Sequence, residues 1–88
     1  MRVWVAQLHI SERTIAKIRG RHGLDPADLR DQIVCVSTLT GRFDEDPIRG
    51  GRIIVQVTIH GQEVIAVLYP SKKRIEGDWH LGSAYRRP

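Results

Sequence analysis

Alternating apolar and polar residues in the second half of the chain predict a β-hairpin. Residues 52–60 and 63–69 are rich in valine and isoleucine, and only Gly61 and Gln62 lie between them. A two-residue turn with glycine first is typical of type II′, which joins antiparallel strands. We therefore expect two long paired strands at this place.

The turn also predicts the register of these strands and the side chains on each face. It places Ile59 opposite Val64, with Val57 opposite Ala66 as the next pair on the same face. That face is wholly apolar, as expected of a sheet face that packs on helices. Its members are Ile53, Val55, Val57, Ile59, Val64, Ala66 and Leu68. The other face carries Ile54, Ile65, Val67 and Tyr69 as an apolar strip, which we expect to bind a partner.

Apolar residues recur every three to four positions in the first half of the chain, which predicts two helices. Ser11 is a candidate N-cap for a helix that runs to about residues 20–21, with Gly23 as the left-handed residue that follows it. Asp25 and Pro26 form a second start signal, which opens a helix over residues 26–36. Residues 3–8 before these helices are typical of a strand.

The remaining segments complete an α+β fold. Residues 37–51 contain glycine, proline and the acids Asp44, Glu45 and Asp46, and predict a solvated loop with an extended piece near 39–43. Residues 79–85 predict a last strand. The sequence thus predicts one domain, residues 1–88, with an N-terminal strand and two helices on one face of an antiparallel sheet of about four strands.

Composition narrows the function classes. Lys and Arg number 14 against 10 Asp and Glu, and only Lys17, Lys72 and Lys73 are lysines. Arginine binds phosphate and carboxylate in a planar fork, which suits nucleic acid or an acidic protein partner, although a GC-rich genome also favours arginine. Cys35 is the only cysteine, so no disulfide forms within the chain. The chain lacks a signal segment and an apolar run of about 18 residues, so we expect a cytoplasmic protein.

Several segments resemble the RelE/ParE superfamily of bacterial toxins, most closely its BrnT-like branch. They are Arg21-His22-Gly23-Leu24, residues 25–36, residues 44–52, the hairpin, and Gly82-Ser83-Ala84-Tyr85-Arg86-Arg87. The resemblance implies the toxin of a type II toxin–antitoxin system that acts as a metal-independent endoribonuclease without a cofactor. It also implies a cognate antitoxin as partner, RNA (free or on the ribosome) as substrate, and a hetero-oligomer or a homodimer.

RNA cleavage without a metal needs a base, an acid and cations on the phosphate. If Trp79 and Leu81 point to the core, His80, Gly82, Ala84 and Arg86 share the open face of the sheet. The expected catalytic residues are His80, Arg52, Arg86 and Tyr69. The expected RNA-binding residues are Lys72, Lys73, Arg74 and Arg87, and the expected partner-binding residues are Ile54, Ile65 and Val67.

Other histidines carry less signal, because His9 and His60 lie at strand ends and His22 at a helix end. Two other functions stay open. The same fold can be a non-enzymatic binding module, either a ParE-like gyrase inhibitor or a nucleic-acid-binding subunit, and the chain can be a nucleic-acid-binding protein unrelated to toxins.

Overall fold

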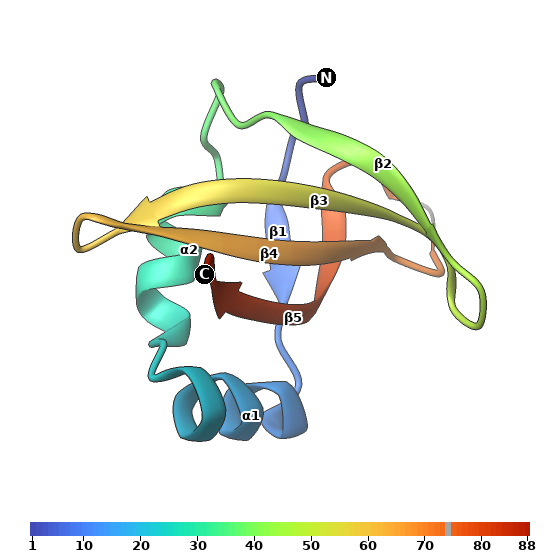
Figure 1. The fold of residues 1–88 in the computed structure, drawn as a ribbon. Helices are drawn as coiled ribbons and strands as arrows, with labels where there is room; N and C mark the ends of the chain where they lie inside the picture. The colour runs from blue at the N-terminus through green and yellow to red at the C-terminus, as the bar shows by residue number, and fades with distance from the viewer. Residues whose placement is uncertain (74) are drawn as a thin grey trace.

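A computed structural model describes residues 1–73 and 75–88, so the predicted RNA contact of Arg74 lies outside the described residues. The elements follow the order β1 (Gln7–His9), α1 (Glu12–His22), α2 (Pro26–Ile33), β2 (Gly41–Asp46), β3 (Gly50–Ile59), β4 (Gln62–Pro70) and β5 (Asp78–Arg86) (Figure 1). The strands form one sheet in the order β1-β5-β4-β3-β2, in which β1 is parallel to β5 and the other pairs are antiparallel. The predicted α+β class is confirmed.

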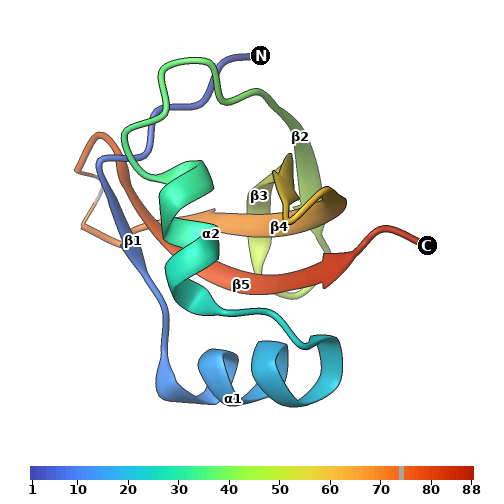
Figure 2. The same ribbon diagram turned by 90° about the vertical axis from the view of Figure 1, so that its left-hand side faces the viewer.

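Both helices lie on one side of the sheet (Figure 2). Helix α1 begins after Ser11, whose hydroxyl accepts a hydrogen bond from the Thr14 amide at 3.2 Å, and ends before Gly23 with φ 61°. Helix α2 begins after Asp25, as predicted, but ends at Ile33 instead of residue 36. The chain leaves the helix there because Cys35 has φ 59° and its amide donates to the Val5 carbonyl. No described helix is long and apolar enough to span a membrane.

Strand β2 replaces much of the loop predicted over residues 37–51, and it begins within the extended piece predicted near 39–43 but continues to Asp46. It pairs with β3, and Asp44 lies directly opposite Arg52. Charged residues alternate along it, with Arg42, Asp44 and Asp46 on the open face of the sheet. Propensity disfavours such a strand, but charge is typical of an edge strand, where it discourages pairing with other chains.

The hairpin turn differs from the predicted one. The connecting residues are His60 and Gly61, with φ 50° and 77°, which is the sign pattern of a type I′ turn. Ile59 therefore pairs with Gln62, and Val57 with Val64 rather than with Ala66. The predicted register was wrong by two residues. A shift of two keeps every side chain on its face, so the seven side chains expected in the core are all buried, with at most 7% exposed.

The corrected turn makes a stability prediction. Gly61→Ala should lower the free energy of unfolding by about 1–2 kcal/mol, because a Cβ disfavours positive φ. Gly20 is the matched control, since it lies in α1 with open space where a Cβ would stand. Gly20→Ala should raise the free energy by about 1 kcal/mol. Urea titrations measure both free energies of unfolding. A Gly61→Ala variant as stable as the wild type would contradict the type I′ turn.

A bulge in β5 corrects the predicted faces of that strand. Leu68 pairs with Leu81, but Val67 pairs with Ser83, so Gly82 is an extra residue. The bulge shifts the alternation, so Ala84 and Arg86 turn to the helix side while Ser83 and Tyr85 lie on the open face. The expectation that Ala84 and Arg86 share the open face with His80 was wrong, whereas Gly82 does lie beside Tyr69 on that face. Glycine is required at position 82 because a Cβ there would collide with the Tyr69 ring.

Candidate functional site

A pocket of about 720 Å³ opens where β1, β4 and β5 meet the loop after β4. Its walls carry two histidines, His9 and His80, and three basic side chains, Arg49, Lys72 and Lys73. Tyr69 lines it as well, 9% exposed. Titratable side chains that gather in one pocket make it the candidate functional site.

The two histidines lie side by side because β1 and β5 are parallel. His9 is the register partner of His80. The ring centroids are 4.9 Å apart, with 30° between the planes. Both residues are exposed to solvent. Imidazole exchanges a proton near neutral pH, so this pair can supply both a base and an acid.

A buried carboxylate orients His9. The His9 Nε2 atom lies 2.5 Å from Asp78 Oδ1, and Asp78 is only 8% exposed. Burial alone would raise the pKa of Asp78, but hydrogen bonds from Ser71 and His9 outweigh it and hold the pKa below its ordinary value. Asp78 is therefore ionised at neutral pH. With Nε2–H donated to Asp78, Nδ1 is the ring nitrogen of His9 that can accept a proton.

The basic side chains of the pocket are available to an anion. The Arg49 guanidinium lies 4.0 Å above the centre of the Tyr69 ring, and Lys72 and Lys73 are exposed. Within residues 1–73 and 75–88, no carboxylate lies within ion-pair distance of these three side chains. Unpaired cations around two histidines favour a phosphate ligand.

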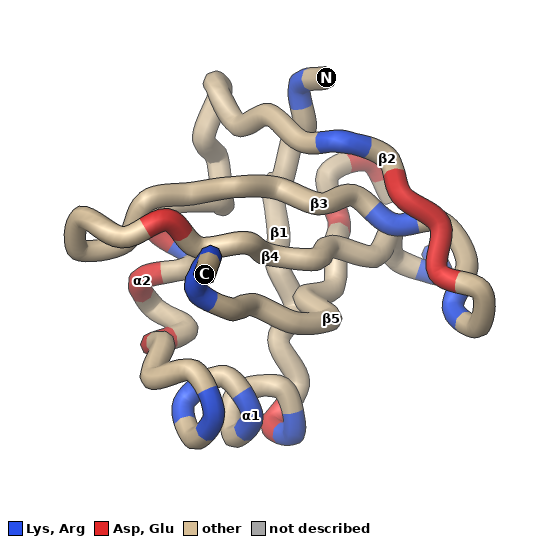
Figure 3. Tube along the Cα trace, in the orientation of Figure 1, with Lys and Arg blue, Asp and Glu red and all other residues tan. Residues whose placement is uncertain are grey.

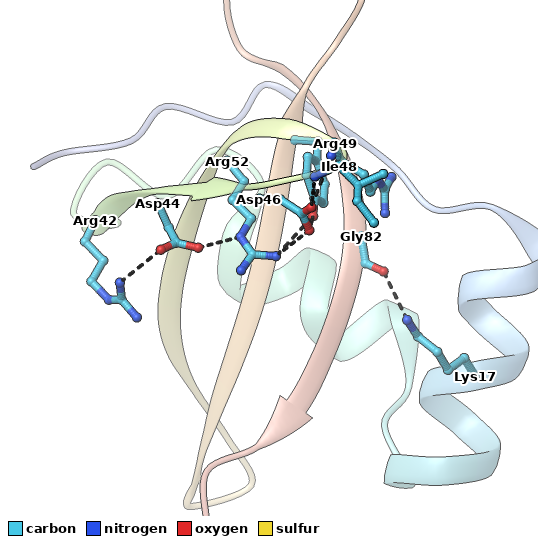
Figure 4. A network of polar contacts seen from close by, with 9 residues as sticks. Lys17, Arg42, Asp44, Asp46, Ile48, Arg49, Arg52 and Gly82 are labelled. Atoms are coloured by element: carbon cyan, nitrogen blue, oxygen red, sulfur yellow. Dashed lines mark hydrogen bonds and ion pairs between the residues drawn. The ribbon is translucent and has the colours of Figure 1, made fainter.

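Arg52 behaves differently, because carboxylates surround it (Figure 4). Its Nε donates to Asp44 at 2.6 Å, and its Nη1 donates to Asp46 and to the Tyr69 hydroxyl, both at 3.2 Å. The bonds with Tyr69 and Asp44 raise the pKa of Arg52. Backbone amides of Ile48 and Arg49, and then Arg52, hold the pKa of Asp46 below its ordinary value. This network fixes the turn that carries Arg49, so the geometry favours Arg49 over Arg52 as the arginine that faces an anion.

The remaining predicted catalytic residues divide between two places. Tyr69 and His80 are opposite each other on β4 and β5, and Lys72 and Lys73 line the same pocket. Arg86 lies elsewhere, on the helix side, where its Nη2 donates to the Gly23 carbonyl at 3.4 Å.

The residues expected to bind a partner, and Arg87, lie farther along the open face. Ile54 and Ile65 are half-buried and line a second hollow of about 470 Å³, with Arg42 and Arg87 also in its walls. Arg87 bonds to Gln56 and Glu63. Val67 is only 6% exposed, so it adds little to the surface of the expected strip.

Three residues that line the pocket, His9, Ser71 and Arg49, were not among the predicted site residues, and neither was Asp78, which contacts His9. His9 reaches the site through a strand pairing that spans most of the chain, which no local pattern reveals. The one local hint was an acid two residues before a histidine, Asp78 before His80.

Charge is distributed unevenly along the fold (Figure 3). Lys and Arg gather on α1 and at the end of β5, whereas acids dominate β2.

Comparisons of the chain with models of protein families, with curated proteins and with solved structures found no match.

Proposed function

We propose that this chain is an endoribonuclease that cleaves RNA without a metal ion or cofactor, with the pocket of His9 and His80 as its active site. One observation carries the proposal. Two adjacent histidines, one of them held by a buried carboxylate, face a pocket whose basic side chains have no described acidic partner. A base, an acid and cations are the groups that are needed to transfer a phosphate ester to a neighbouring hydroxyl.

The chemistry follows from the two rings. His9 Nδ1 accepts the proton of the ribose 2′-hydroxyl, and the 2′-oxygen attacks the adjacent phosphorus. The bond from phosphorus to the 5′-oxygen breaks, and His80, protonated at the start, donates its proton to that oxygen. The products are a 2′,3′-cyclic phosphate and a 5′-hydroxyl. Proton exchange with water restores both histidines.

The other side chains act on charge and orientation. Arg49, Lys72 and Lys73 would stabilise the negative charge that grows on the phosphate in the transition state. Asp78 is a positioning residue, because it holds His9 in the tautomer with a basic Nδ1 and stabilises the imidazolium that forms. The ring of Tyr69 holds the Arg49 guanidinium in place by a cation–π contact.

The resemblance to RelE/ParE-type and BrnT-like toxins supplies the biological setting of the proposal. The order of a strand, two helices and an antiparallel sheet supports it. In that setting the chain is a cytoplasmic toxin that an antitoxin neutralises. The hollow beside Ile54 and Ile65, with Arg42 and Arg87 in its walls, suits an acidic, amphipathic antitoxin segment.

Incubation of the purified protein with an unstructured RNA tests the proposal. We expect cleavage of the RNA in the presence of EDTA, and no cleavage of DNA of the same sequence, which lacks the 2′-hydroxyl. If the folded protein binds RNA but leaves it intact, the enzyme proposal fails and a nucleic-acid-binding module remains. Inhibition of DNA gyrase with no effect on RNA would point to the ParE-like function.

A further inference from the structure

A second cluster of polar and aromatic side chains lies at the far ends of α1 and β5. His22 is the last residue of α1, and its ring centroid is 6.3 Å from that of Tyr85, with 50° between the planes. The neighbouring Arg86 lays its guanidinium against Gly23. His22 and Tyr85 are half-buried and Arg86 is exposed, so part of the ring surface and the cation are both accessible to solvent at this end of β5.

Helix α1 connects this cluster to the active-site pocket. Thr14 near its start lines the pocket beside Gly82, and Lys17 Nζ donates to the Gly82 carbonyl at 3.2 Å (Figure 4). The helix then runs along β5 to the contact of His22 with Tyr85. An 11-residue helix is about 16 Å long. The five steps of β5 from His80 to Tyr85 also span about 16 Å.

The cations along this route favour a polyanion. Arg19 lies 4.0 Å from Asp25, a weak and exposed pair. Among the described residues, no carboxylate is within ion-pair distance of Arg21 or of Arg86. Aromatic rings beside arginine are the usual platform for an unpaired base and its phosphate. An acidic peptide would use the cations but would gain little from the rings.

We propose that His22, Tyr85 and Arg86 form a subsite for single-stranded RNA, with a base on the ring of Tyr85 and a phosphate on Arg86. The inference rests on the proposed function, since the same strand would continue to the pocket for cleavage. A distance of about 16 Å corresponds to about five nucleotides at the stacked spacing of about 3.4 Å, and to fewer in an extended strand. The enzyme should therefore prefer substrates several nucleotides long.

Cleavage of two substrates with the same cut site, a dinucleotide and a ten-nucleotide RNA, tests the subsite. The wild-type protein should cleave the longer RNA with the higher kcat/KM. Tyr85→Ala should lower kcat/KM for the longer RNA by about 5- to 150-fold, the usual worth of one stacked base, and leave the value for the dinucleotide unchanged. Tyr85→Phe is the matched control, because it keeps the ring and should behave as wild type.

Other outcomes separate the subsite from the proposed function. An equal fall in kcat/KM on both substrates in Tyr85→Ala would overturn the subsite. So would a wild-type protein that cleaves the two substrates equally well. If the wild-type protein cleaves neither substrate, the proposed function fails, and fluorescence anisotropy with a ten-nucleotide 2′-deoxy analogue then decides the subsite. Weaker binding by Tyr85→Ala, restored in Tyr85→Phe, would support it. Equal binding by all three proteins would overturn it.

Discussion

Replacing either pocket histidine by asparagine should lower the rate of RNA cleavage by about 100- to 10,000-fold, the usual contribution of a general acid or base. His9→Asn removes the ring whose Nε2 contacts Asp78, and His80→Asn removes its neighbour. Asparagine keeps a polar side chain of similar reach but cannot exchange a proton near neutral pH. Initial rates on one RNA, with circular dichroism as a check on folding, measure the effect.

His60 provides a matched control. It is a histidine in the hairpin turn, away from the pocket, and its positive φ is one that asparagine tolerates. His60→Asn should cleave RNA at nearly the wild-type rate. If folded His9→Asn and His80→Asn keep the wild-type rate as well, the two rings are not the catalytic groups.

Leu68→Ala should lower the free energy of unfolding by about 2–5 kcal/mol, because deleting buried methyl groups leaves a cavity. Leu68 is fully buried at 0% exposed, and it lies between Ile53 on β3 and Leu81 on β5. The free energy of unfolding of a native domain is typically about 5–15 kcal/mol, so this loss is a large part of it. The variant should therefore unfold in much less urea than the wild type.

Two further variants show whether burial is the cause. Leu68→Met keeps most of the volume and should cost less than about 1.5 kcal/mol. Thr58→Ala changes an exposed residue of β3 and should stay within about 0.5 kcal/mol. If Leu68→Ala lowers the free energy of unfolding no more than Thr58→Ala does, the core described here is contradicted.

Local patterns predicted the parts of the fold that depend on neighbouring residues. Ser11, Gly23 and Asp25 bound the helices as their capping chemistry requires. The apolar alternation predicted the buried face of the hairpin, although the turn was shifted, because a shift of two residues preserves each face.

What the sequence did not reveal depends on pairing between distant segments. The bulge at Gly82 reverses the alternation in β5, and a strand pattern alone does not show where an extra residue falls. Strand β2 has charged rather than apolar residues and forms by pairing with β3, where Asp44 contacts Arg52. The site was found only in part for the same reason, since His9 meets His80 through a parallel pairing of the first and last strands.

The chemical state of the cleaved RNA ends tests the central claim most directly. Mass spectrometry of the products, made in the presence of EDTA, should show a 2′,3′-cyclic phosphate on one fragment and a 5′-hydroxyl on the other. A single 2′-deoxy nucleotide at the cut site should abolish that cut. Products with a 3′-hydroxyl and a 5′-phosphate, or cleavage that survives the 2′-deoxy substitution, would contradict the mechanism assigned to His9 and His80.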